Sequence, residues 1–363
     1  MRNFFAFMAV TVMAATVSAS QARRDALAAT PALPATYPVG VDTITAVTPA
    51  DDPVEVFFNP GKMFGFGDLM TADYANKTGA VFRSAGNSKF GAYLDHKSTL
   101  MNALSASTGQ PESIPIDLLY GMKGDSFSWG AGLHYSNAED KVGLKKSSSL
   151  GIGAGAVADA WEAYVNLGFI GKSELNTPTG TTATANLMIR VGGQYNLGSG
   201  SIYADFQSGG GKTTALATST DTNITNSLLT IGFEDKLKGE GSHLFYGVKY
   251  EMYSVKVGDQ GSGTASRLPV YFGLEADVAS WLVARASFAQ PVLIDSSKEV
   301  APTGTTITDT TSMTQPALGL GIGIKFGKFV LDGTLAARGN GVTKGGDLNA
   351  GDFMNELSAT YTF

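Results

Sequence analysis

The last stretch of the chain, residues 353–363, reads FMNELSATYTF and alternates as a β-strand does. Five of the six residues on one face are apolar, namely Phe353, Leu357, Ala359, Tyr361 and Phe363, and Asn355 is the polar exception. Because successive side chains of a strand point to opposite faces, the pattern predicts a strand with one apolar and one mostly polar side. Its 11 residues fit the roughly 9–11 residues of a tilted strand that crosses a bilayer.

The chain ends on an aromatic residue, and this ending resembles the C-terminal strand of bacterial outer-membrane β-barrels. In those proteins the final aromatic residue helps the barrel-assembly machinery to recognise the chain. The resemblance implies that Tyr361 and Phe363 form an assembly signal. The edge strand of a soluble β-sandwich would show the same alternation, so the rest of the chain has to distinguish the two folds.

The same alternation recurs from about residue 66 onward and predicts 16 strands. They span residues 66–74, 78–84, 89–95, 115–123, 126–136, 148–158, 161–170, 186–197, 200–208, 226–235, 243–254, 267–278, 280–290, 315–326, 328–338 and 353–363. Counted back from Phe363, short connections alternate with long ones rich in Gly, Ser, Thr, Asn and Asp. The long ones are residues 96–114, 137–147, 171–185, 209–225, 255–266, 291–314 and 339–352.

Tight turns on one rim and long loops on the other are typical of outer-membrane barrels. The sequence therefore predicts an all-β fold, a transmembrane antiparallel β-barrel of about 16 strands with short periplasmic turns and long extracellular loops. Fourteen strands is the alternative if residues 66–84 belong to a plug.

Three regions are expected along the chain. Residues 1–22 are typical of a secretory signal peptide, with Arg2 before an apolar run and small residues before a cleavage site. Residues 23–60 form an irregular segment rich in Pro and Ala, which is either a periplasmic tail or a hatch in the lumen. Residues 61–363 form the barrel. No apolar run after residue 22 is long enough for a membrane-spanning helix.

The stretch FFNPGKM, residues 57–63, resembles the Asn-Pro-Ala segment before the first strand in the fatty-acid-transporter superfamily of outer-membrane barrels. Asn59 and Pro60 match that motif, and Gly61 replaces the usual Ala. In that family an N-terminal hatch plugs the lumen, so the resemblance implies a plug here. A simple Asn-Pro turn is the alternative reading.

Composition argues against catalysis and cofactors. The chain has no cysteine, and its three histidines, His96, His134 and His243, lie far apart in sequence, so neither a metal site nor a catalytic triad is expected. SGGGKTT at residues 208–214 lacks the first glycine of a phosphate-binding loop and is expected in a surface loop. The net charge of −6 without a basic stripe argues against nucleic acid as a partner. We expect no enzyme activity and no cofactor.

Strand parity predicts which charged side chains line the lumen, because a charge that faces lipid is costly. The predicted pore-lining residues are Lys89, Asp95, Asp117, Lys123, Glu162, Arg190, Asp205, Glu234, Lys249, Glu251, Glu275, Arg285, Lys325, Asp332, Arg338 and Glu356. Acidic members outnumber basic ones, so a water-filled lumen is expected to prefer cations weakly.

The sequence thus predicts an outer-membrane porin of a bacterial cell, for passive diffusion of small hydrophilic solutes and ions. The alternatives are a hatch-plugged transporter of hydrophobic compounds and a structural or adhesive surface barrel. The expected partners are outer-membrane lipid, the barrel-assembly machinery, small solutes and further copies of the chain in a homo-trimer.

Overall fold

The computed structural model describes residues 23, 26, 27, 53–74, 77–97, 112, 114–259, 261–300, 306–311, 316–337 and 356–363. Two short 3-10 helices are η1 (Pro53–Phe57) and η2 (Pro60–Phe64). The strands are β1 (Leu69–Asp73), β2 (Thr78–Ala85), β3 (Ser88–Leu94), β4 (Ile116–Lys123), β5 (Phe127–Asp140), β6 (Lys145–Ala158), β7 (Trp161–Leu175), β8 (Thr181–Ala185), β9 (Met188–Leu197), β10 (Gly200–Ala215), β11 (Thr220–Gly239), β12 (Ser242–Val257), β13 (Gly261–Ala279), β14 (Leu282–Val300), β15 (Thr306–Thr311), β16 (Ala317–Phe326), β17 (Phe329–Ala337) and β18 (Glu356–Thr362). The predicted signal peptide, residues 1–22, and Arg338 lie outside the described residues.

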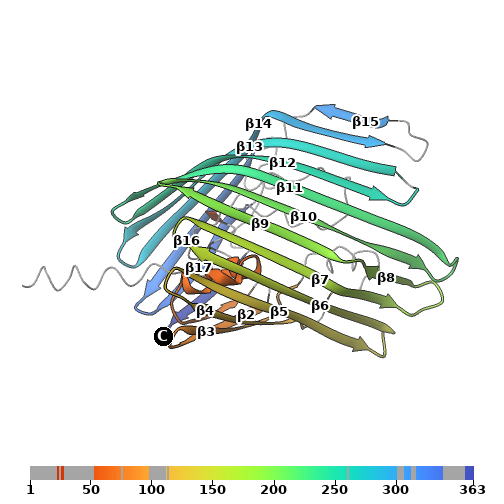
Figure 1. Cartoon of the computed structure of the whole chain (residues 1–363), viewed down its shortest axis with the longest axis horizontal. Helices are drawn as coiled ribbons and strands as arrows, with labels where there is room; N and C mark the ends of the chain where they lie inside the picture. Colours follow the sequence, from red (N-terminus) through yellow and green to blue (C-terminus); the bar gives the residue numbers. More distant parts are fainter. Residues whose placement is uncertain are drawn as a thin grey trace, which may run out of the picture.

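The strands form one closed antiparallel barrel (Figure 1). Segments β8 and β9 both pair with β7 and β10, and β15 and β16 both pair with β14, so each couple occupies one position in the wall. The wall therefore has 16 strands. Strand β1 pairs with both β2 and β18, and Leu69 lies opposite Thr362 at the closure. The barrel thus has 16 strands and not 14, because β1 and β2 belong to the wall.

The strands reach well past their predicted ends at one rim. Strand β11 pairs with β10 along the whole length of β10, so most of the loop expected at residues 209–225 is strand, and SGGGKTT lies within β10. The loops expected at 137–147, 171–185, 255–266 and 291–314 are also strand over much of their described length. Beyond the bilayer both faces of a hairpin meet water, so the apolar alternation fades while the backbone pairing continues.

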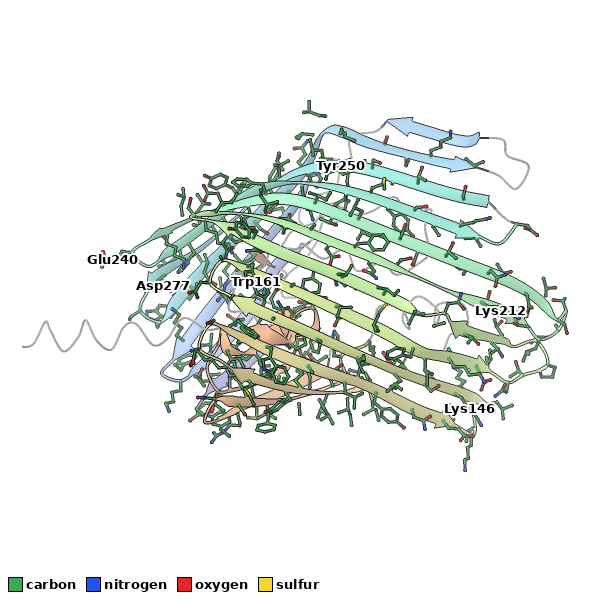
Figure 2. The ribbon with its side chains drawn as sticks, in the orientation of Figure 1. Lys146, Trp161, Lys212, Glu240, Tyr250 and Asp277 are labelled. Atoms are coloured by element: carbon green, nitrogen blue, oxygen red, sulfur yellow. The ribbon has the colours of Figure 1, made fainter. Side chains whose placement is uncertain are left out.

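The two rims are distinguished by their turns (Figure 2). Glu240 and Asp277 lie at the end with the tight turns, and Lys146 and Lys212 lie at the extended end. Aromatic side chains at the tight-turn end are exposed, including Trp161, as expected for a belt at headgroup depth.

Alternate residues of the strands face the exterior and the lumen. Large apolar side chains such as Leu118, Val191, Ile231 and Phe272 are exposed, whereas side chains of the opposite parity are buried and mostly polar. An outer apolar face is what a barrel wall requires against lipid, because every unpaired charge there would be costly. None of the described helices has the length and apolar character of a membrane span.

Residues 53–66, which we call the plug, lie inside the barrel (Figure 1, orange). Helix η2 packs against the inner faces of β4, β5 and β6. Val56, Met63 and Phe66 of the plug form a buried apolar cluster with wall residues that include Phe82 and Leu119. The wall therefore begins at β1, later than the expected boundary at residue 61.

Candidate functional site

The Asn-Pro stretch fixes the plug to a glycine-rich part of the wall. The Asn59 side chain accepts a hydrogen bond from the Gly61 amide at 3.1 Å and caps η2. Its amide nitrogen donates to the Ala156 carbonyl at 3.3 Å. A Cβ at Gly155 would overlap Asn59 Oδ1, and one at Gly130 would overlap the Pro60 carbonyl. Glycine is thus required on the wall because the plug backbone approaches so closely.

An ion-pair clamp holds the same segment. Lys62 Nζ lies 2.9 Å from Glu55 within the plug and 2.9 Å from Glu162 on β7. Burial by itself lowers the pKa of Lys62, but the two carboxylates outweigh it and raise the pKa above its ordinary value. Lys62 therefore stays charged through the neutral range and binds plug to wall.

A second wall group receives the plug at Phe58. Arg190 places its guanidinium 4.2 Å from the centre of the Phe58 ring, and its Nε donates to Asp205 at 2.8 Å. Asn166 donates from Nδ2 to the Phe58 carbonyl at 2.9 Å. The cation over the ring and the amide contact orient Phe58 along the wall.

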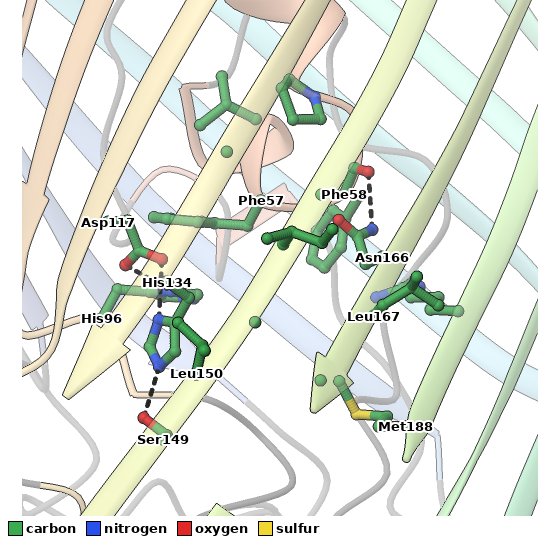
Figure 3. Close-up of a pocket in the computed structure, with 18 of the residues that line it drawn as sticks. Phe57, Phe58, His96, Asp117, His134, Ser149, Leu150, Asn166, Leu167 and Met188 are labelled. Carbon is green, nitrogen blue, oxygen red and sulfur yellow. Dashed lines mark hydrogen bonds and ion pairs between the residues drawn. The ribbon is translucent and has the colours of Figure 1, made fainter. Parts of the chain in front are cut away.

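Between the plug and the wall is a cavity of about 140 Å³ (Figure 3). Its apolar lining includes Val56, Phe57 and Phe58 from the plug and Leu119 and Met188 from the wall. Cavities of roughly 150 Å³ with such a lining hold a benzene-sized guest. The pocket therefore suits a small apolar group.

One end of the pocket is polar. His134 Nδ1 lies 2.8 Å from Asp117 Oδ1, and its Nε2 lies 2.8 Å from Glu112 and 3.1 Å from Ser149 Oγ (Figure 3). The line from serine through histidine to aspartate has the order of a hydrolytic triad. However, the Ser149 hydroxyl donates to Glu112, whose carboxylate also faces Nε2 of His134. The Ser149 hydroxyl proton is therefore directed to Glu112 and not to the His134 ring that would act as general base in a triad, and the arrangement is a polar network.

A separate network of ion pairs involves β13, β14 and β17. Glu275 accepts hydrogen bonds from Arg285 at 2.6 Å and from Arg23 at 2.8 Å, and Arg285 also reaches Asp332 at 2.7 Å. The Ala26 carbonyl accepts a hydrogen bond from Ser287 at 2.8 Å. The described part of the N-terminal segment thus also contacts the inner wall.

Most of the predicted pore-lining residues are buried or half-buried in the structure. Those that are buried in the lumen are Lys89, Asp117, Arg190, Asp205, Glu234, Lys249, Glu251, Arg285 and Asp332, while Asp95, Glu162, Glu275, Lys325 and Glu356 are half-buried. Lys123 is exposed at the tight-turn end of β4. Many of these charges pair with one another, as Lys249 does with Glu251 at 2.7 Å and Arg190 with Asp205 at 2.8 Å. Whether they line a water-filled path stays a prediction.

Sequence reasoning missed several residues of the site. Glu55 and Lys62 lie in a segment without a period, and Glu112 lies in a predicted loop, so no pattern marked them. His134 could have been found, because it has the inward parity of β5 and lies directly opposite Asp117 on β4. His96 follows β3 and is brought within 6.5 Å of His134, measured between ring centres, although 37 residues separate the two.

No protein family and no curated protein matches the chain in sequence. Among solved structures, the fold is similar to OmpT, an outer membrane protein of Vibrio cholerae, with 11% identity, a TM-score of 0.38, and coverage of 81% of this chain and 95% of that one. The CymD monoaromatic hydrocarbon channel has 12% identity and a TM-score of 0.38, with coverage of 89% of this chain and 96% of that one. The FrpB iron transporter from Neisseria meningitidis has 12% identity and a TM-score of 0.41, with coverage of 74% of this chain and 54% of that one. The closed wall with an apolar outer face is itself the architecture of bacterial outer-membrane β-barrels.

Proposed function

We propose that the protein is an outer-membrane channel through which small, largely apolar compounds enter a bacterial cell. The observation that carries this proposal is the apolar pocket between plug and wall. A lumen built for hydrophilic solutes would offer a wetted polar path, whereas this pocket offers Val56, Phe57, Phe58, Leu119 and Met188 to its occupant. The plug resembles the hatch implied by the Asn-Pro motif, and it holds the occupant against the wall.

The pocket supplies both affinity and orientation. Burying an apolar group there gains roughly 25 cal/mol for each Å² removed from water. The polar end with Asp117, His134 and Ser149 gives a partner to one oxygen or nitrogen of the compound, so an apolar ring with one polar substituent fits best.

The test is ligand binding by purified, refolded barrel. We expect toluene and phenol to bind in a saturable manner, with glucose as the non-binding control. Leu119→Trp fills the pocket from β4 and should reduce affinity at least tenfold. Leu237→Trp adds the same ring at an exposed position on β11 and should leave binding unchanged. Equal binding by both variants would contradict the assignment of this pocket.

A diffusion porin is the second candidate, and the observation in its favour is the excess of acidic side chains in the inward set. Planar-bilayer recordings separate the two. A porin conducts steadily without any ligand and shows a weak cation preference that fades with salt. The plugged channel gives low conductance until the plug is disturbed.

A further inference from the structure

Three potential metal ligands meet at the polar end of the pocket. His96 follows β3, Asp117 lies on β4 and His134 lies on β5, so neighbouring parts of the wall supply all three. Their ligand atoms all lie within 4.8 Å of one another. Two imidazoles and a carboxylate form a donor set that suits divalent transition ions.

The geometry between two of these residues is unusual for a hydrogen-bonded pair. His96 Nδ1 lies 3.4 Å from Asp117 Oδ2, and both atoms are buried without a hydrogen-bond partner. This separation exceeds the ordinary range for an N–H···O bond, which ends at about 3.2 Å. Two ligands on one tetrahedral ion, each at about 2.1 Å, would be roughly 3.4 Å apart. A bridging cation therefore accounts for the spacing and satisfies both atoms.

We propose that His96, Asp117 and His134 bind one divalent metal ion of the zinc type. Asp117 is the centre of the site, because its two oxygens face the two histidines, Oδ1 towards His134 and Oδ2 towards His96. Asp117 is also almost fully buried, so its charge requires compensation within the lumen.

The surroundings prepare both imidazoles for this role. The His134 Nε2 lies 2.8 Å from Glu112, and a proton held on that nitrogen by the carboxylate would let Nδ1 bind a metal in place of its 2.8 Å contact with Asp117 Oδ1. The His96 ring stacks on Phe57 of the plug, with ring centres 3.4 Å apart and planes 8° apart, and this contact aims Nδ1 at Asp117. Such supporting contacts are typical of built metal sites.

The position of the site gives it a consequence for the channel. All three ligands line the pocket, so a fourth coordination position opens towards the occupant and can take an oxygen donor such as a phenolate or a carboxylate. Because His96 packs on Phe57, an ion at this site also ties the plug to the wall. Metal binding itself does not depend on the uptake proposal and can be measured without any transported compound.

The experiment uses tag-free, full-length mature protein in detergent, stripped with a chelator and titrated with Zn²⁺ alone. We expect one Zn²⁺ per chain, and a four-coordinate absorption spectrum when Co²⁺ replaces it. His96→Gln and Asp117→Asn should each weaken binding at least tenfold. Glu112→Gln, which loses only the supporting carboxylate, should weaken it about 10- to 100-fold.

His243→Gln is the matched control, because His243 is exposed on β12 and is not part of this group. Heat-modifiable mobility and β-type circular dichroism identify variants that have folded. His96 lies outside the strand ladder, so its variant keeps the test informative if Asp117→Asn does not fold. Absence of stoichiometric Zn²⁺ in wild-type protein, or equal affinities for His96→Gln and His243→Gln, would overturn the proposal.

Discussion

Lys62 Nζ lies 2.9 Å from Glu162 Oε1, and this ion pair joins the plug to the barrel wall. Both side chains are largely buried, and Glu55 contacts the same ammonium group. Breaking one member of a buried pair leaves uncompensated charge, which costs far more than losing an exposed pair. The clamp is therefore the point at which the plug is easiest to release by substitution.

Lys62→Met should release the plug. The substitution leaves Glu55 and Glu162 facing each other without a cation, at a cost of about 3–5 kcal/mol in the free energy of docking. We expect higher conductance in planar bilayers, and protease cleavage within residues 53–66 that wild-type protein resists. Lys328→Met, which removes an exposed positive charge from the turn before β17, is the control and should change neither property.

The clamp should persist across the neutral pH range. The pKa of Lys62 is raised from its ordinary value of 10.5, so its stabilising contribution is complete below that value and is lost only as the pH rises above it. Plug protection from protease should therefore be the same at pH 7 and pH 9. A loss of protection between these values would show that the ammonium group does not hold the plug.

Gly155→Ala should displace the plug through a change in the wall, whereas Lys62→Met changes the plug itself. The added methyl group meets Asn59 Oδ1, and overpacking of this kind costs about 1–3 kcal/mol. We expect weaker toluene binding together with raised conductance. Gly79→Ala is the matched control on β2, because its methyl group would only reach ordinary contact with the Thr71 carbonyl, at 3.6 Å. Identical behaviour of the two variants would argue against close docking at Gly155.

Leu331→Arg and Val248→Arg should destabilise the barrel. Both residues have the outward parity of their strands, since Asp332 and Lys249 beside them are buried inside. An arginine that faces lipid costs about 2–4 kcal/mol at the midplane of the bilayer. Thr220→Arg at the exposed start of β11 is the control. Urea unfolding in lipid vesicles measures the difference, and equal stabilities would mean that the outer face is misassigned.

Removal of Phe363 should reduce membrane insertion. Its amide donates to the Asp68 carbonyl at 3.0 Å, its ring lies under Arg83, and it packs against Tyr361. The deletion therefore weakens the closure of the barrel as well as the expected assembly signal. Phe363→Tyr keeps the ring and should insert normally. The yield of heat-modifiable protein in outer-membrane fractions is the readout, and an undiminished yield for the deletion would count against this role.

The sequence predicts the strands of the wall well where contact with the bilayer requires apolar and polar residues to alternate. Strands such as β9 and β12 follow residues that alternate between apolar and polar, and their predicted and observed bounds nearly agree. In residues 209–215 both faces are polar or small, so periodicity alone cannot distinguish a hydrated strand from a loop. Strands β10 and β11 extend further because their backbones pair across the hairpin. This pairing leaves no periodic pattern in the local sequence.

The site was less predictable from the sequence. Its residues come together through the alignment of neighbouring strands and through the folding of the plug into the lumen. Asp117 and His134 meet because they lie directly opposite each other on β4 and β5, and a slip of one strand by one residue would turn that strand's side chain to the lipid face. Lys62 meets Glu162 because the plug, whose sequence shows no period, folds into the lumen. Charge parity predicts that Glu162 faces the lumen but does not name its partner, Lys62.

The pairing of β1 with β18 imposes an order of events during biogenesis. The plug immediately precedes β1, and β1 completes the ring only when the last strand of the chain is in place. Once the ring of backbone hydrogen bonds has closed, a segment can reach the lumen only through the two mouths of the barrel. We therefore expect residues 53–66 to settle against β5 and β6 before β1 pairs with β18. A barrel that closed first would have to thread its plug in through a mouth, which is a slower route and a source of misfolded species.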